Sequence, residues 1–170
     1  MNIVSVKGID MIADLDFMHI ARIISKSATC SRHRVGAVIV KDNRIISHGY
    51  NGVPKGHVHC NKIFGFDSDS DGHHQWSKEN EIHAEANAIL WAGRSGISCE
   101  NSDIYVTMSP CEDCCKLIVS SGISRVFYQV EYRHAKEDWW KYLVKSGVSV
   151  FKYTESENES EYGPSFKQLS

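Results

Sequence analysis

Hydrophobic side chains recur along the chain at two spacings, and each spacing predicts one kind of element. Across residues 10–28 they return every three or four positions, which is typical of an amphipathic helix. Further helices are expected at residues 80–92, 110–121 and 137–147. Short apolar runs predict strands at residues 35–40, 44–50, 103–108, 125–130 and 148–153. This order predicts an α/β fold in which helices pack on the faces of a mixed sheet.

Two segments depart from this regular pattern. Residues 57–80 contain four histidines, one cysteine and the polar run DSDSDG, so we expect a long irregular insertion. Such loops are uncommon unless they are functional or held in place by other groups. Residues 155–170 are polar and acidic, and this tail is expected to be mobile. The remaining residues, 1–154, are long enough for one compact domain.

The composition limits the classes of partner. The formal net charge is −2 and no run of lysine and arginine stands out, whereas proteins that bind nucleic-acid polymers usually carry a basic surface. No stretch approaches the roughly 20 apolar residues of a membrane span, and a signal-peptide pattern is absent. We therefore expect a cytoplasmic protein, in the host cytoplasm if it is viral, with no membrane or polymer partner. The chain contains six cysteines and nine histidines. In a reducing cytoplasm, cysteines near histidines indicate metal ligands rather than disulfides.

Two short motifs at the starts of predicted helices carry the strongest chemical signal. His83, Ala84 and Glu85 form the first, and the second is Pro-Cys-Glu-Asp-Cys, in which Cys111 and Cys114 share one side of a helix. One imidazole and two thiolates leave the fourth position of zinc open for water, as in catalytic rather than structural sites. Glu85 is then placed to shuttle protons. His-x-Glu followed by Pro-Cys-x-x-Cys is the signature of zinc-dependent deaminases of nucleobases.

Four segments extend this signature into a family resemblance. They are HAEANAIL (83–90), YVTMSPCEDC (105–114), CSRHRVGAVIV (30–40) and GYNGVP (49–54). Together they closely resemble the deoxycytidylate deaminase branch of the cytidine-deaminase superfamily, nearest to its phage-type members. The resemblance implies a three-layer fold with a five-stranded sheet, and a homo-oligomer that is commonly a hexamer. It also implies hydrolysis of dCMP to dUMP and ammonia, which supplies dUMP for dTMP synthesis.

The same resemblance assigns residues that contact the substrate. Asn51 matches the position that holds the sugar 3′-hydroxyl, and Ala84 matches a backbone contact to the pyrimidine. Ser109 lies beside the zinc helix, and Tyr132 matches an aromatic residue of the pocket. The 5′-phosphate needs charge-assisted donors, and spacing does not choose among the candidates. These candidates are Ser31, Arg34 and Arg133.

A second zinc site is also implied by the phage-type members. Cys30, Cys60 and His73 match three of its ligands and Glu81 matches the fourth, with His59 and His74 as adjacent alternatives. A metal there would hold the polar insertion against the rest of the domain. The alternative is a buried free cysteine and a solvent-exposed histidine loop.

Regulation by nucleotides is the last property that the resemblance implies. In allosteric relatives dCTP activates and dTTP inhibits, and Mg²⁺ can accompany the effector. The matching positions here are Gly52, Trp91 and Arg94, of which the aromatic ring would stack on the base and the arginine would pair with phosphate. The alternative is that Trp91 is a core residue and Arg94 is an exposed arginine at the end of a helix, with no effector role for either.

Two rival functions share part of this pattern. An adenosine deaminase that acts on tRNA also carries the two motifs, but the GYNGVP loop and the lack of a basic run argue against it. A catalytically silent module that binds zinc or nucleotide would need neither Glu85 nor an open coordination position. The sequence leaves the choice among dCMP, dCTP and CMP open.

Overall fold

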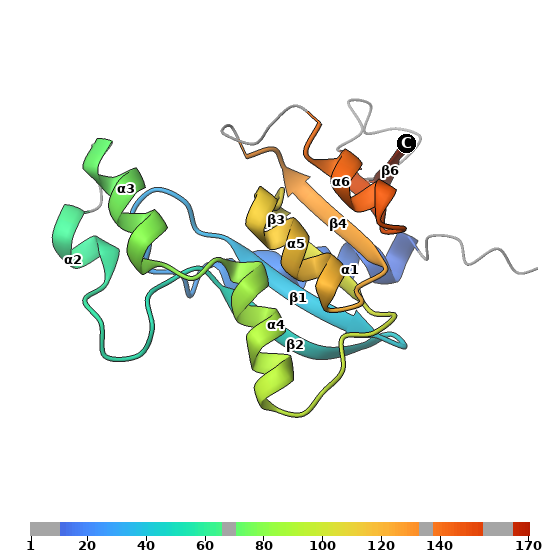
Figure 1. Cartoon of the computed structure of the whole chain (residues 1–170), viewed down its shortest axis with the longest axis horizontal. Helices are drawn as coiled ribbons and strands as arrows, with labels where there is room; N and C mark the ends of the chain where they lie inside the picture. The colour runs from blue at the N-terminus through green and yellow to red at the C-terminus, as the bar shows by residue number, and fades with distance from the viewer. Residues whose placement is uncertain (1–10, 66–70, 133–137, 155–164) are drawn as a thin grey trace, which may run out of the picture.

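Six strands form one mixed sheet in the computed structural model, which describes residues 11–65, 71–132, 138–154 and 165–170 (Figure 1). The strand order is β2-β1-β3-β4-β5-β6. β1 pairs antiparallel with both β2 and β3. β4 pairs parallel with both β3 and β5, and β6 pairs antiparallel with β5. The strands are β1 (Gly36–Lys41), β2 (Arg44–Tyr50), β3 (Asp103–Met108), β4 (Arg125–Val130), β5 (Ser149–Thr154) and β6 (Ser165–Leu169).

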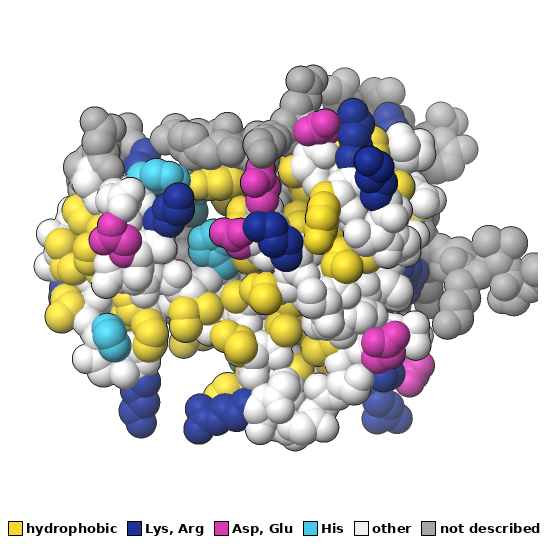
Figure 2. All heavy atoms as spheres, viewed as in Figure 1, with side chains coloured by type: hydrophobic (Ala, Val, Ile, Leu, Met, Phe, Trp, Pro, Cys, Tyr) yellow, Lys and Arg dark blue, Asp and Glu magenta, His cyan; other side chains and the backbone are white. Residues whose placement is uncertain are grey.

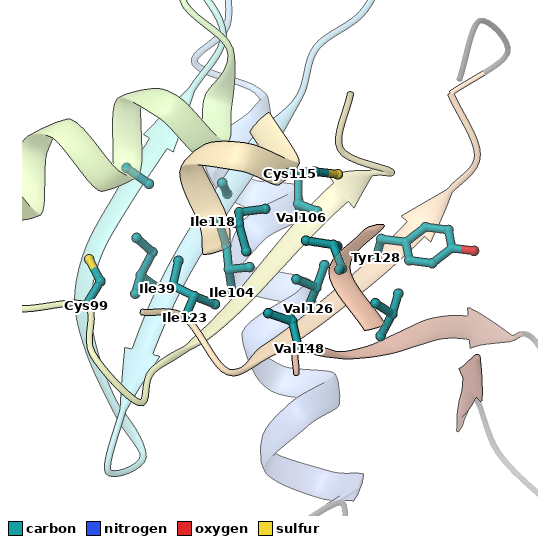
Figure 3. Packing of buried hydrophobic residues seen from close by; sticks show 14 of the residues in the cluster. Ile39, Cys99, Ile104, Val106, Cys115, Ile118, Ile123, Val126, Tyr128 and Val148 are labelled. Atoms are coloured by element: carbon teal, nitrogen blue, oxygen red, sulfur yellow. The ribbon is translucent and has the colours of Figure 1, made fainter. Parts of the chain in front are cut away.

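Helices cover both faces of the sheet, as predicted. On one face α1 packs its Met18 and Ala21 against Val38, Tyr105 and Phe127 of the strands. On the other face α4, α5 and α6 enclose a second apolar cluster (Figure 3). Among the described helices, none has the length and apolar character that crossing a bilayer requires. The helices are α1 (Met11–Ser25), α2 (Cys60–Phe64), α3 (Asp71–Asn80), α4 (Ala84–Arg94), α5 (Glu112–Ser120) and α6 (Trp140–Lys145).

The prediction of an irregular insertion is wrong for most of its length. Residues 60–64 and 71–80 form α2 and α3, which lie together at one side of the molecule (Figure 1). These helices carry few apolar side chains, so the period that reveals a helix in sequence is weak there. Buried Cys60 and His73 are among the residues that attach them to the domain.

The predicted mobile tail ends in a strand, so the sheet has six strands rather than five. β6 pairs antiparallel with β5, and Phe166 is only 7% exposed. Its ring packs edge-on against Phe127, with 5.0 Å between ring centroids. One buried aromatic residue among polar neighbours gives little periodicity, and therefore the strand was missed. Residues 155–164 of the tail lie outside the described part of the chain.

Gly49 of β2 allows α4 to approach the sheet closely, and we predict that this glycine cannot be replaced without cost. A Cβ atom at Gly49 would lie 2.4 Å from the carbonyl oxygen of Ala84 and 2.5 Å from the amide nitrogen of Ala88. Gly49→Ala should lower the free energy of unfolding by about 1–3 kcal/mol, because overpacking forces the backbone to shift. Urea denaturation of the variant and the unmodified protein would measure this change in the free energy of unfolding.

Gly93, which lies in α4, is the matched control for the substitution of Gly49. No atom lies within 4 Å of a Cβ placed there, and Gly93 has no positive φ. Gly93→Ala should leave stability unchanged or raise it by up to about 1 kcal/mol, since alanine is the better helix former. Equal losses in the two variants would show that the close approach of β2 and α4 is not the cause.

Candidate active site and metal centres

Three predicted ligands meet where the starts of α4 and α5 come together. His83 directly precedes α4 and Cys111 directly precedes α5, both with extended backbone. The Nδ1 atom of His83 lies 3.3 Å from the Sγ of Cys111 and 3.5 Å from the Sγ of Cys114. All three ligand atoms lie within 4.8 Å of one another. One imidazole nitrogen and two sulfurs form a donor set that suits zinc.

Hydrogen bonds within this triad shift the protonation of its members. Cys114 and His83 lower the pKa of Cys111 to about 4, and the bond to Cys111 raises the pKa of His83 to about 9. The bond to Cys111 and burial raise the pKa of Cys114. The lowered pKa favours the thiolate form of Cys111. A zinc ion would take the place of the protons on His83 and Cys114, as metal binding to such ligands requires.

Glu85 lies in the first turn of α4, two residues after the ligand His83. Its side chain is 4% exposed, and it lines the same cleft as His83 and Cys111. Burial raises the pKa of the Glu85 carboxyl to about 7, although the charge of His83 acts in the opposite direction. A carboxyl group with such a pKa can accept and release a proton near neutral pH.

His83, Cys111 and Glu85 line an open cleft, and concave sites of this kind are where small molecules bind. Figure 2 shows histidine and acidic side chains in the hollow between the α2–α3 region and the sheet. Four of the predicted substrate contacts line this cleft: Asn51, Ala84, Ser109 and Tyr132. Ser31 and Arg34 are not among its lining residues, and Arg133 lies outside the described part of the chain. Their roles stay predictions.

Asn51 fixes the loop that forms one wall of the cleft. It is buried, accepts a hydrogen bond from the amide of Val35 at 2.8 Å, and donates one to the carbonyl of His33 at 2.9 Å. The next residue, Gly52, forms a two-bond bridge with Ile82, directly before His83. The GYNG loop is thus tied to the segment that carries the first metal ligand. The effector role of Gly52 stays a prediction.

A second group of potential ligands comes from three distant parts of the chain. The Nε2 atom of His73 lies 2.9 Å from the Sγ of Cys60 and 3.5 Å from the Sγ of Cys30. All three residues are buried, and their ligand atoms lie within 4.8 Å of one another. Burial raises the pKa of Cys30 to about 11 and lowers that of His73. Two buried thiols facing a neutral imidazole again match the preferences of zinc.

Glu81 provides an independent test of whether a cation fits here. Its Oε1 atom is buried without a hydrogen-bond partner among the described residues, while Oε2 accepts a bond from Ser77 at 2.6 Å. Its charge acts on both Cys30 and His73, so the carboxylate lies near the cluster. A buried carboxylate oxygen without a donor is costly unless a cation or water satisfies it. The residues present therefore fit a second metal ion.

The alternative ligands His59 and His74 lie outside this cluster. His59 precedes α2, and its ring bonds to the hydroxyl of Thr29 at 2.9 Å. His74 follows His73 on α3, and it lines the cleft instead. Both ligand groups border one continuous cleft, because Cys30 and His73 line it together with His83 and Cys111.

Comparison with known proteins agrees with this geometry. The family model for the cytidine and deoxycytidylate deaminase zinc-binding region matches residues 11–130. The chain belongs to this family. Deoxycytidylate deaminase of Enterobacteria phage T4 is 39% identical over 166 residues, which cover 79% of this chain and 86% of the relative. The enzyme of phage T2 is 38% identical, with 79% and 88% covered.

A solved structure of the same family supports the fold at the level of coordinates. The dCMP deaminase of cyanophage S-TIM5, in complex with dCMP and dUMP, is similar with a TM-score of 0.68 and 34% identity. The match covers 81% of this chain and 94% of that chain. The α/β fold and the zinc-dependent deaminase class predicted from the motifs are thus confirmed.

Two of the three residues predicted to bind an effector nucleotide, Trp91 and Arg94, lie on the outside of α4. Trp91 is 57% exposed, and the guanidinium of Arg94 lies 5.6 Å from the centre of its ring. Neither residue lines the cleft. The alternative of a core tryptophan is therefore wrong, while the effector role of Trp91 and Arg94 stays a prediction.

Several cleft residues of this deaminase were not predicted from the sequence. Arg32 and His33 follow Cys30 in the chain, and Ser77 comes from α3. Arg32 and Arg34 stand in one irregular segment, where no period indicates which side chain faces inward. Only the path of the backbone decides between them.

Proposed function

We propose that this protein hydrolyses dCMP to dUMP and ammonia. The proposal rests on one observation, the meeting of His83, Cys111 and Cys114 beside buried Glu85 at an open cleft. Relatives with the name deoxycytidylate deaminase, and a related structure in complex with dCMP and dUMP, support this substrate. The reaction forms a bond between a water oxygen and C4 of cytosine and breaks the bond to the amino group.

The residues of the chain divide the chemistry among them. His83, Cys111 and Cys114 would hold zinc, which supplies a nucleophile at neutral pH by lowering the pKa of water. Glu85 accepts a proton from the attacking water and passes protons to the ring nitrogen and to the departing amino group. Its raised pKa, about 7, suits a group that both accepts and donates. Because Glu85 is buried, bulk water does not compete for these protons.

The walls of the cleft would orient the nucleotide. Asn51 would hold the 3′-hydroxyl, and its two bonds to the 33–35 segment fix its side chain for that purpose. The backbone of Ala84 would contact the pyrimidine. Tyr132 is held in place through its amide, which donates to Ser109 at 2.8 Å, and its ring lies edge-on to that of His33.

The proposal includes regulation and assembly. dCTP would activate and dTTP would inhibit, bound with Mg²⁺ near Gly52, Trp91 and Arg94, and the chain would form a homo-oligomer, expected to be a hexamer. The exposed pair of Trp91 and Arg94 supports an effector site, since an aromatic face and a guanidinium suit a base and a phosphate. In the cytoplasm the product dUMP would serve dTMP synthesis.

One assay series tests this proposal. Ammonia release should be fastest with dCMP, compared with deoxycytidine, CMP, dCTP and unmodified tRNA as substrates. At low dCMP concentration, added dCTP should increase the rate and added dTTP should reduce it. Turnover of tRNA alone would replace the proposal with the rival adenosine deaminase. No turnover of any substrate by zinc-loaded protein would favour a catalytically silent module.

A further inference from the structure

Glu131 follows the last residue of β4 and accepts hydrogen bonds from three side chains. The hydroxyl of Tyr128 and the ammonium of Lys152 on β5 both donate to its Oε1 atom, the ammonium at 3.2 Å. The indole Nε1–H of Trp139 donates to Oε2 at 3.3 Å. Partial burial alone would raise the pKa of Glu131, but these three hydrogen bonds lower it. The donors therefore stabilise the charged carboxylate.

The three donors around Glu131 also contact one another. The rings of Tyr128 and Trp139 meet edge-on, with 5.2 Å between their centroids, and the Lys152 ammonium lies 6.0 Å from the centre of the Tyr128 ring. Tyr128 and Trp139 are buried in the apolar cluster on the α4, α5 and α6 side of the sheet. Glu131 is thus joined to the interior of the domain, and its bond to Trp139 spans the connection between β4 and α6.

Tyr132, the next residue of this connection, lines the cleft. Its amide donates to the hydroxyl of Ser109 at 2.8 Å, and the amide of Ser109 donates to the carbonyl of Val130 at 2.7 Å. The last pair between β3 and β4 joins Met108 to Val130, so the regular pairing of these strands ends just before Glu131. Beyond this point, hydrogen bonds to side chains fix the path of the backbone that carries Tyr132.

We propose that Glu131 is a positioning residue, which fixes the backbone after β4 so that Tyr132 presents its ring to the nucleotide in the cleft. Glu131 itself does not line the cleft, so it acts through Tyr132 and not by contact with the substrate. The inference rests on the proposed function and adds to it a residue that lies outside both zinc motifs. The side chains of Glu131 and Lys152 are 46% and 38% exposed, so solvent weakens their ion pair and we expect a moderate effect.

Kinetics of dCMP deamination test this role. Glu131→Gln places an amide group among three donors, so it should raise KM for dCMP by about three- to tenfold. The value of kcat should change less than about twofold, because binding is weakened while proton transfer by Glu85 is not affected. Glu131→Asp, which keeps the charge, should recover part of the loss. Tyr128→Phe removes one donor and keeps the buried ring, so it should give a smaller increase in KM.

Asp138→Asn is the matched control. This exposed carboxylate belongs to the same connection and pairs with Lys141 at 3.5 Å, so its loss should leave KM and kcat within about twofold of the unmodified protein. A similar rise in KM in Asp138→Asn and Glu131→Gln would show that any lost charge in this connection has the same effect, and would overturn the proposal.

A double-mutant cycle determines whether Glu131 acts through Tyr132. In the Tyr132→Ala background, Glu131→Gln should change KM less than about twofold, since the effects of residues that act as one unit do not add. An equal increase in KM in both backgrounds, or a loss confined to kcat, would overturn the proposal.

Hydrogen–deuterium exchange separates this inference from the proposed function, because it needs no substrate. Peptides that contain Tyr132 should exchange faster in Glu131→Gln than in the unmodified protein, whereas peptides from α1 should exchange at the same rate. If the unmodified protein does not deaminate dCMP, the proposed function fails by itself, and the exchange rates still decide whether Glu131 fixes this segment. Unchanged exchange of the peptides with Tyr132 would overturn the inference.

Discussion

Glu85→Gln is expected to lower kcat for dCMP by about 10²- to 10⁴-fold, the usual contribution of a general acid–base group. Glutamine keeps the shape of the side chain but cannot carry a proton between the attacking water and the departing amino group. The side chain is 4% exposed and lies in the first turn of α4, so no solvent water takes over this task. Ammonia release at saturating dCMP would measure the loss.

The matched control is Glu112→Gln. Glu112 occupies the first turn of α5, as Glu85 does in α4, but it is exposed and outside the cleft lining. Its substitution should change kcat less than about twofold, because the side chain is exposed and does not line the cleft. Both variants should retain the zinc content of the unmodified protein, since neither residue belongs to a ligand group. Undiminished deamination by Glu85→Gln would contradict the assigned role.

The central part of the fold was predictable because its signals are local. The first two apolar runs predicted β1 and β2, which pair as a hairpin whose turn residues, Asp42 and Asn43, have left-handed φ values of 50° and 58°. Each strand of the core shows a dense apolar run. β6, α2 and α3 differ because their stability depends on contacts with distant residues, such as Phe127 for Phe166, that no local pattern contains.

The metal ligands were predictable for a related reason. His83, Cys111 and Cys114 belong to short motifs at helix starts, where backbone geometry fixes the direction of a side chain. Part of the cleft wall comes instead from the irregular segment before β1, so Arg32 could not be distinguished from Arg34. Similarly, Glu131, which precedes Tyr132, accepts hydrogen bonds from Trp139 and from Lys152 of β5, and no motif in the sequence indicates these contacts.

Cys60→Ser should remove one of two zinc ions per chain and destabilise the α2–α3 region. Cys60 is completely buried, and its Sγ contacts both His73 and Ser31, so a single thiol joins α3 to the segment before β1. If zinc is present at a thousand times its dissociation constant, losing the site costs about 4 kcal/mol of stability. Metal analysis and thermal unfolding would measure both effects.

Cys99→Ser separates the loss of a metal ligand from the loss of a buried thiol. Cys99 is 6% exposed and packs in the apolar cluster on the α4 side of the sheet, outside both ligand groups (Figure 3). Its variant should keep two zinc ions and lose only about 1–2 kcal/mol of stability, the cost of a polar atom in an apolar site. One zinc ion per chain in the unmodified protein, or two in Cys60→Ser, would exclude metal binding at the second cluster.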